Sequence, residues 1–329
     1  MAAHKSNVSR IIRALGPFLI LGFVLALFAI IMNADARETF FSVYSFKTIL
    51  TQTVIVAIGA LGMTMIIVSA GIDLSVGSVI ALTSVIGAVL INQNWSVASV
   101  ICLCIAVGGF VGLINGVIIA GFQMTPFIVT LGMLGIARGM AKKIANNQTV
   151  NFVSEDAVHA VGRLMMDPNP TGWAVSPGII AAIILAVLTA ILMQRTIFGR
   201  YIFAIGSNEA TARLCGIRTR LNKIGIYCVA GMLFGIAGIM QLSRLRQGDP
   251  STAIGIELDI IAAVVIGGAS LNGGTGSILG SMIGALTMAV LRSGSIQSDW
   301  PNYMQEIIIG IVIILAVGLD KWRQTRAQT

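Results

Sequence analysis

The feature that most constrains this chain is a series of long apolar segments whose middles contain no Asp, Glu, Lys, Arg or His. About 20 apolar residues in a helix cross the hydrocarbon core of a bilayer, where a helix satisfies its own backbone polar groups. The composition agrees, because only 10% of the residues are charged, whereas about 25% are charged in a soluble domain. We therefore predict an all-α fold, a polytopic bundle of transmembrane helices.

About ten such segments can be drawn in the chain. They cover residues 14–32, 49–69, 76–91, 97–120, 127–141, 176–193, 224–242, 258–269, 277–291 and 304–319. The segment 258–269 is too short to cross a bilayer alone and predicts a short or broken helix. A cleaved signal peptide is the alternative for the first segment, but residues 14–32 are longer than a usual signal-peptide core, which favours an uncleaved helix.

Basic residues give the expected orientation. Residues 195–223 contain six of the 21 basic residues and a single acid, Glu209. Cytoplasmic loops carry an excess of Lys and Arg, so both termini and this segment are predicted to face the cytoplasm. The predicted organisation is a cytoplasmic tail (1–13), a transmembrane domain (14–320) with a cytoplasmic coupling loop (195–223) and a periplasmic loop (142–175), and a second cytoplasmic tail (321–329).

Several classes of function find no support in the sequence. No G-x-x-x-x-G-K-[ST] motif is present, so we expect no nucleotide-binding P-loop, no ATPase activity and no catalytic residue in this chain. Cys102 and Cys104 would point to different faces of a helix, and the two histidines are isolated, so we expect no metal site. The basic residues are interpreted as orientation signals, with no nucleic-acid partner.

Glycine spacing predicts close helix packing in two of the segments. Small residues four apart form ridges that let helix backbones approach each other. Two such ridges are present, Gly108, Gly112 and Gly116 in the first and Gly276, Gly280 and Gly284 in the second.

A chain without a nucleotide motif or mid-membrane charges resembles a transport body without a motor of its own. A proton-driven carrier usually buries ionisable groups in its spans. Energy would then come from another protein at the cytoplasmic face. The candidate docking element is a short helix that begins at Ser207 or Asn208 and ends near Gly216. Its predicted coupling residues are Ser207, Asn208, Glu209, Ala210, Arg213, Gly216 and Ile217; a merely solvated basic loop is the alternative.

Two further segments are candidates for a pathway or gate. Asp73 can accept hydrogen bonds from the backbone N–H groups of Ser75 or Val76 and cap the next helix, so a capped turn is one interpretation of residues 69–78 and a gate is the other. An apolar helix followed by a glycine-rich stretch over 257–276 predicts a broken or re-entrant element, which is either buried or lines a cavity. The residues assigned to this pathway are Gly71, Asp73, Ser75, Gly77, Ser78, Glu257, Asp259, Gly267, Gly268, Gly273, Gly274 and Gly276.

These three segments carry a family resemblance. Residues 71–78 (GIDLSVGS), 199–217 and 257–276 resemble the corresponding motifs of bacterial sugar ABC-transporter permeases of the ribose, xylose and arabinose type. The likeness covers about residues 48–319. It implies an inner-membrane subunit that works as a dimer, with cytoplasmic ATPase subunits docked around Glu209 and a periplasmic sugar-binding protein on the outer face. ATP and Mg²⁺ would be bound by the ATPase, with no cofactor in this chain.

Three alternatives stay open at this point. A branched-chain amino-acid permease would have a similar architecture and another ligand, and a binding assay with pentoses and leucine separates the two. An ion-coupled carrier would accumulate solute by itself in liposomes under an ion gradient. A membrane scaffold without transport activity would show no stimulated ATPase activity in a co-purified complex.

Overall fold

The computed structural model describes residues 2–153, 161–165, 175–301, 303–311, 314 and 318. The helices before residue 145 are α1 (Ala2–Ile31), α2 (Ala34–Phe40), α3 (Val43–Val68), α4 (Val76–Asn92), α5 (Val97–Gly121) and α6 (Pro126–Ile144). After it come α8 (Pro177–Arg195), α9 (Ile197–Ser207), α10 (Glu209–Leu214), α11 (Thr219–Leu245), α12 (Ile256–Ile266) and α13 (Ile278–Gln297). Two short strands, β1 (Val150–Asn151) and β2 (Gln247–Gly248), pair antiparallel.

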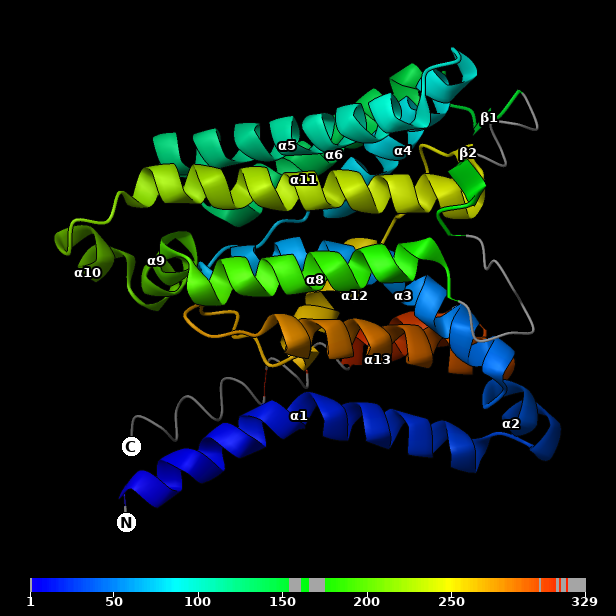
Figure 1. Ribbon diagram of the computed structural model, residues 1–329, viewed down its shortest axis with the longest axis horizontal. Helices are drawn as coiled ribbons and strands as arrows, with labels where there is room; N and C mark the ends of the chain where they lie inside the picture. Colours follow the sequence, from blue (N-terminus) through cyan, green and yellow to red (C-terminus); the bar gives the residue numbers. More distant parts are fainter. Residues whose placement is uncertain are drawn as a thin grey trace.

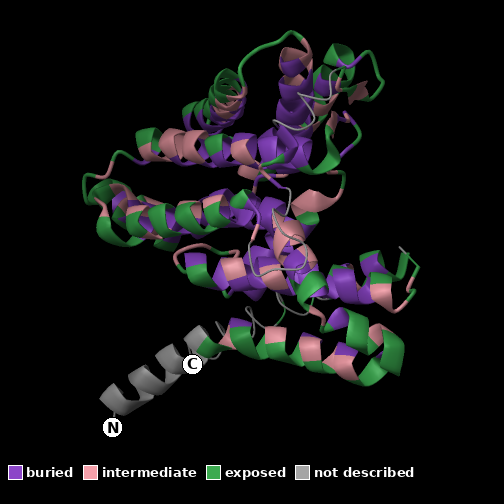
Figure 2. Cartoon of the chain, turned by 45° about the vertical axis from the view of Figure 1, so that its right-hand side comes forward, coloured by how far each residue is buried: buried purple, intermediate pink, exposed green. Residues whose placement is uncertain are grey.

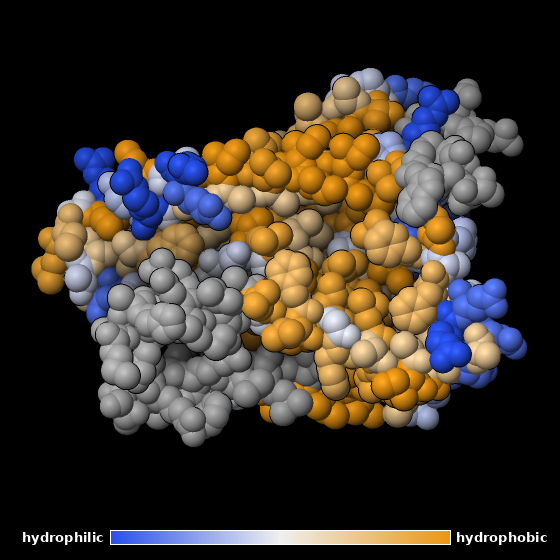
Figure 3. Space-filling view, turned by 60° about the horizontal axis from the view of Figure 1, so that its bottom comes forward, coloured by the Kyte–Doolittle hydropathy of each residue, from blue (hydrophilic) through white to orange (hydrophobic). Residues whose placement is uncertain are grey.

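The long helices lie side by side along one direction, as expected for a membrane bundle (Figure 1). Among the described residues, five helices are long and apolar enough to span a membrane: α3, α5, α8, α11 and α13. Hydrophobic residues form a band between hydrophilic groups at the two ends of the molecule (Figure 3). This arrangement confirms the predicted all-α polytopic fold.

The centre of the bundle is α3. Its residues from Val54 to Val68 are almost all buried, and it packs against α8, α11, α12 and α13. Figure 2 shows this concentration of buried residues in the central helices, whereas the outer helices have more exposed residues. The exposed face of α8, which includes Ile180, Ile184 and Leu188, is suited to lipid.

Glycines bring α5 and α11 into backbone contact, as the first glycine ridge predicts. A Cβ on Gly112 would overlap the carbonyl oxygen of Tyr227, and one on Gly108 would lie 2.8 Å from the backbone nitrogen of Gly235. The second ridge behaves in the same way, because Gly280 packs on Gly267 and Gly284 on Ala263. The hydrophobic effect does not drive helices together inside a bilayer. Close van der Waals packing of this kind therefore contributes to the association of membrane helices.

Two helices, α4 and α12, begin inside the bundle rather than at its surface. The first turn of α4 meets the start of α12, since a Cβ on Gly77 would lie 2.5 Å from both the carbonyl oxygen of Ala253 and Oε2 of Glu257. The 11 residues of α12 make it too short to span a bilayer, which confirms the prediction of a short helix over 258–269.

Every predicted span overlaps a helix. In the last span, 304–319, the structure shows helix up to residue 311, starting from residue 303. The helices α11 and α13 continue beyond the predicted spans, to Leu245 and Gln297, and therefore include Arg244 and Arg292. The helix α6, which continues to Ile144, includes Arg138 near its predicted end. Arg138 and Arg292 have polar partners in the bundle, so their charges do not end the helix.

Residues 195–223, predicted to be a loop with one short helix, are mostly helical. The additional helix α9 buries Gly199, Ile202, Ile205 and Gly206. This three-to-four-residue spacing is the pattern of an amphipathic helix, and the basic residues around it obscured that signal.

We expect Gly112→Ala to destabilise the protein, because the added methyl group forces α5 away from α11. Overpacking of this kind typically costs about 1–3 kcal/mol. Thermal unfolding in detergent measures the effect. The control is Gly132→Ala on α6, where a Cβ meets no atom within 4 Å. Equal melting temperatures for the two variants would contradict the packing role of Gly112.

Candidate functional site: the inner junction and the coupling segment

Three segments that are far apart in the sequence meet at one point, which we call the inner junction: Val68–Ala70, Gly206–Ser207 and Gly273–Gly274. The backbone N–H of Gly274 donates to the carbonyl oxygen of Val68 at 2.9 Å. A Cβ on Gly273 would lie 2.7 Å from the carbonyl oxygen of Gly206 and 2.9 Å from the nitrogen of Ala70. One on Gly206 would overlap the carbonyl oxygen of Val68. The structure thus brings together parts of all three segments that the sequence singled out.

Glycine is needed at the junction for its backbone conformation as well as its size. Gly273 and Gly274 have φ values of 86° and 74°, in the left-handed region that disfavours side chains. Gly268, which lies before them in the same stretch, has a φ of 88°. Gly267 packs against Gly280 of α13, and a Cβ on Gly276 would lie 2.5 Å from a methyl carbon of Val68. The glycine-rich stretch is therefore a compact turn that contacts α3 and α13.

The turn over residues 69–78 is organised by Asp73. Its side chain is buried, and Oδ1 accepts hydrogen bonds from the backbone N–H of Ser75 at 2.7 Å and from the Ser75 hydroxyl at 2.6 Å. The predicted bond to Ser75 is confirmed. The predicted helix cap is not, because the residue at the cap position of α4 is Ser75, which forms no side-chain capping bond.

Two residues that sequence reasoning missed hold this turn in place. Asn115 on α5 donates to Asp73 Oδ2 at 3.5 Å and to the Ser75 hydroxyl at 3.2 Å. Thr130 on α6 accepts from the backbone N–H of Leu74 and donates to the carbonyl oxygen of Ile72. Each is a polar residue inside an apolar segment, and that is the signal that could have identified them. Ser78 and Gly71 are buried beside the turn.

The coupling segment comprises α9, α10 and the start of α11. Asn208, rather than Ser207, caps α10, and its Oδ1 accepts from the backbone N–H of Thr211 at 2.9 Å. Gly216 follows the helix with a φ of 83°, as predicted for its C-terminal end. Ala212 is buried and anchors the helix, whereas Ser207, Ala210 and Arg213 are exposed and Ile217 is half-buried.

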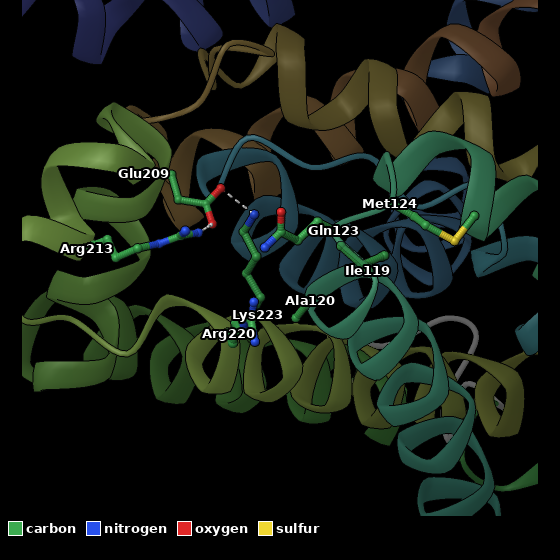
Figure 4. Close-up of a pocket in the computed structure, with 8 residues that line it drawn as sticks. All are labelled: Ile119, Ala120, Gln123, Met124, Glu209, Arg213, Arg220 and Lys223. Atoms are coloured by element: carbon green, nitrogen blue, oxygen red, sulfur yellow. Dashed lines mark hydrogen bonds and ion pairs between the residues drawn. The ribbon is translucent and has the colours of Figure 1, made fainter.

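Glu209 ties α10 to α11. Its carboxylate lies 2.6 Å from Nζ of Lys223 and 3.4 Å from Nη2 of Arg213 (Figure 4). Partial burial acts to raise the pKa of Glu209, but the hydrogen bond and charge of Lys223, together with Arg213, outweigh it and hold the pKa below its ordinary value of 4.5. These residues and the end of α5 line a pocket of about 140 Å³ (Figure 4). The segment is a fixed helix on the bundle and not a solvated loop.

A further set of polar residues lies at the opposite end of α12. Asp259, in the first turn of α12, forms an ion pair with Arg292 of α13 at 2.6 Å, and Glu257 Oε1 accepts from the backbone N–H of Gly255 at 3.3 Å. The sequence singled out both acids, but Arg292 was missed, because the predicted span ended one residue before it. No group of three metal-ligating residues is found in the described part of the chain.

Comparison with known protein sequences places the chain in a family. The model of the family described as "Branched-chain amino acid transport system / permease component" matches residues 45–317. That range includes the inner junction, the coupling segment and both ends of α12. The chain belongs to this family.

Individual relatives of the permease are similar over nearly the whole chain. The "Ribose import permease protein RbsC" of Escherichia coli strain K12 is 38% identical over 306 residues, 92% of each chain. The "L-arabinose ABC transporter permease protein AraH" of Azospirillum brasilense is 35% identical over 82% of this chain and 78% of its own. The "Galactose/methyl galactoside import permease protein MglC" of Escherichia coli strain K12 is 33% identical over 99% of both. No solved structure matches the chain.

We expect the attachment of α10 to weaken in acid. The lowered pKa of Glu209 means that its ion pairs contribute stability above the unfolded pKa and lose it as the pH falls through the folded value. Hydrogen exchange of residues 209–214, corrected for its intrinsic pH dependence, should therefore lose protection below about pH 4.5. In Glu209→Gln, protection should be lower at neutral pH and independent of pH in this range. An unchanged profile in the variant would contradict the role of Glu209.

Proposed function

We propose that this chain is the membrane-spanning subunit of a binding-protein-dependent ABC importer in a bacterial inner membrane. Its substrate would be a monosaccharide, a ribose-like pentose or a related sugar. The observation that carries the proposal is the 33–38% identity, over most of the chain, to permeases named for import of ribose and galactose. Relatives named for arabinose and fructose import add support for a monosaccharide without selecting one.

The energy for transport would come from a partner. The chain contains no P-loop motif, so ATP and Mg²⁺ would be bound by a separate cytoplasmic ATPase subunit. Two permease subunits, identical or different, would form the path, and a periplasmic sugar-binding protein would deliver the substrate. The helix α10 suits an ATPase contact, because it is held rigidly by Glu209 and ends on Leu214, whose side chain is 89% exposed.

The contacts of the inner junction suggest how a movement of the ATPase would reach the substrate path. A single extended residue, Asn208, joins α9 to α10, and the end of α9 touches both Val68 and Gly274 through its backbone. A displacement of α10 would therefore move the ends of α3 and of the 267–276 turn directly. Because the contacts are between backbone atoms, no flexible side chain is available to absorb the movement.

Import of a branched-chain amino acid is the second candidate, because the family description names such a system. Proteoliposomes that contain the permease, its ATPase and its binding protein decide between the two. We expect ATP-dependent uptake of labelled ribose or another monosaccharide and none of leucine. Uptake of leucine alone, or accumulation by the permease without the ATPase, would overturn the proposal.

We expect Leu214→Asp to prevent the ATPase from binding, because it places a charge on the most exposed apolar residue of the coupling segment. Co-purification of the ATPase with a tagged permease measures binding, and the loss should be at least tenfold if Leu214 is a buried anchor of the contact. The matched control is Val153→Asp, which changes an apolar residue that is 85% exposed at the other end of the molecule. Equal ATPase recovery with both variants would contradict docking at α10.

A further inference from the structure

A cavity of about 250 Å³ lies between the first half of α3, the C-terminal parts of α11 and α13 and the start of α12. We call it the outer cavity. Its polar lining comes from four separate helices and consists of Gln52, Gln241, Arg244, Asp259 and Arg292. The contributing ends of α11 and α13 lie opposite α9 and α10 in Figure 1, so the cavity lies in the half of the bundle away from the coupling segment.

The two partners of the ion pair in the cavity differ in their exposure to solvent. The Asp259 side chain is only 7% exposed, whereas that of its partner Arg292 is 51% exposed. A guanidinium has five N–H donors, and Asp259 is the acceptor that Arg292 meets among the described residues. The buried carboxylate therefore holds the arginine in place, at a position where Arg292 lines the cavity.

The wall behind the cavity is fixed by hydrogen bonds. Arg138 on α6 donates to the carbonyl oxygens of Pro250 and Thr252 at 2.8 and 2.6 Å, and Gln241 donates to the Thr252 hydroxyl at 2.6 Å. Ala253 and Gly255 have φ values of 58° and 82°. Irregular backbone at membrane depth is tolerated where it lines a cavity, and these contacts show that this stretch has a single defined shape.

The depth of the ion pair argues against a lipid-facing role. Arg292 lies five residues before the end of α13, about 7 Å along the helix axis. A charged group at this depth is costly in lipid unless it extends towards the headgroups or faces water or protein. Arg292 does not extend outward, because its head group is bound to Asp259 of the neighbouring helix. We therefore expect the outer cavity to contain water.

We propose that the outer cavity is a segment of the substrate path and that a passing sugar forms hydrogen bonds there with Arg292, which Asp259 positions. This inference rests on the proposed function. A sugar hydroxyl can accept a hydrogen bond from Arg292 or Arg244 and donate one to Asp259 or to an amide oxygen of Gln52. Selectivity in a path of this kind depends on its width and on the donors and acceptors that line it.

The first experiment tests whether the cavity contains water. In a functional variant with Cys102, Cys104, Cys215 and Cys228 replaced, Gln52→Cys places a thiol in the cavity, and Ile184→Cys places one on the exposed apolar face of α8 at a similar depth. A membrane-impermeant methanethiosulfonate is then applied from outside. We expect labelling of the first variant at least tenfold faster than that of the second. Equal rates would overturn the proposal, whatever the transported substrate is.

The second experiment tests the contact with sugar. In the complete transporter, Arg292→Gln should lower sugar uptake roughly tenfold, the scale of one charge-assisted hydrogen bond. ATPase activity stimulated by the loaded binding protein should persist, and Arg292→Lys should restore part of the uptake. The control is Arg246→Gln, an exposed arginine near the same end that does not line the cavity, and its uptake should be unchanged.

Two outcomes of the second experiment would overturn the inference. Normal uptake by Arg292→Gln would show that the residue does not contact the sugar, and a parallel loss of uptake and ATPase activity would show a structural role. Failure of the proposed function would give a different result, because the unmodified transporter would then import no monosaccharide. The labelling experiment would still show whether the cavity contains water.

Discussion

The contact on which the rest of the structure depends is the one between the end of α3 and the glycine turn before α13. A single backbone hydrogen bond, from Gly274 to Val68, joins them, and Gly206 fits against both. Backbone groups inside a membrane protein have no water to bind, so a chain that leaves a helix there must find partners in other segments. This requirement explains why the unwound stretches 69–75 and 267–277 lie against each other and against α9 instead of at the surface.

The short helix α12 connects the two ends of the molecule that bear on function. Its 11 residues measure about 16 Å, and it has the Asp259–Arg292 pair in its first turn and the glycine turn of the inner junction after its last. It packs without a gap on α13, where Gly284 meets Ala263. This close packing gives the inner junction and the outer cavity a direct structural connection through one short helix.

Much of the fold could be predicted because the bilayer imposes a simple rule on sequence. Apolar length alone located a helix in every predicted span. Glycine spacing predicted that α5 and α13 pack closely, whereas the structure showed that their partners are α11 and α12. Helix ends were predicted less well. Arg292 seemed to end a span because a charge in an apolar run indicates an interface, and its partner Asp259 lies 33 residues away in the sequence. Asn115 and Thr130 are similar cases, because the residues to which they form hydrogen bonds, in the turn around Asp73, lie far from them in the sequence.

The sequence by itself determined the all-α membrane fold, the broken helix near residue 258 and the short capped helix at Glu209, because each depends on local composition, spacing or capping chemistry. Tertiary structure alone decided that Val68–Ala70, Gly206–Ser207 and Gly273–Gly274 form one junction, and that Gln52, Gln241, Arg244, Asp259 and Arg292 share one cavity. The physical reason is that hydrophobic periodicity reports which residues a helix buries, whereas the partner that each polar group finds depends on how separate helices pack.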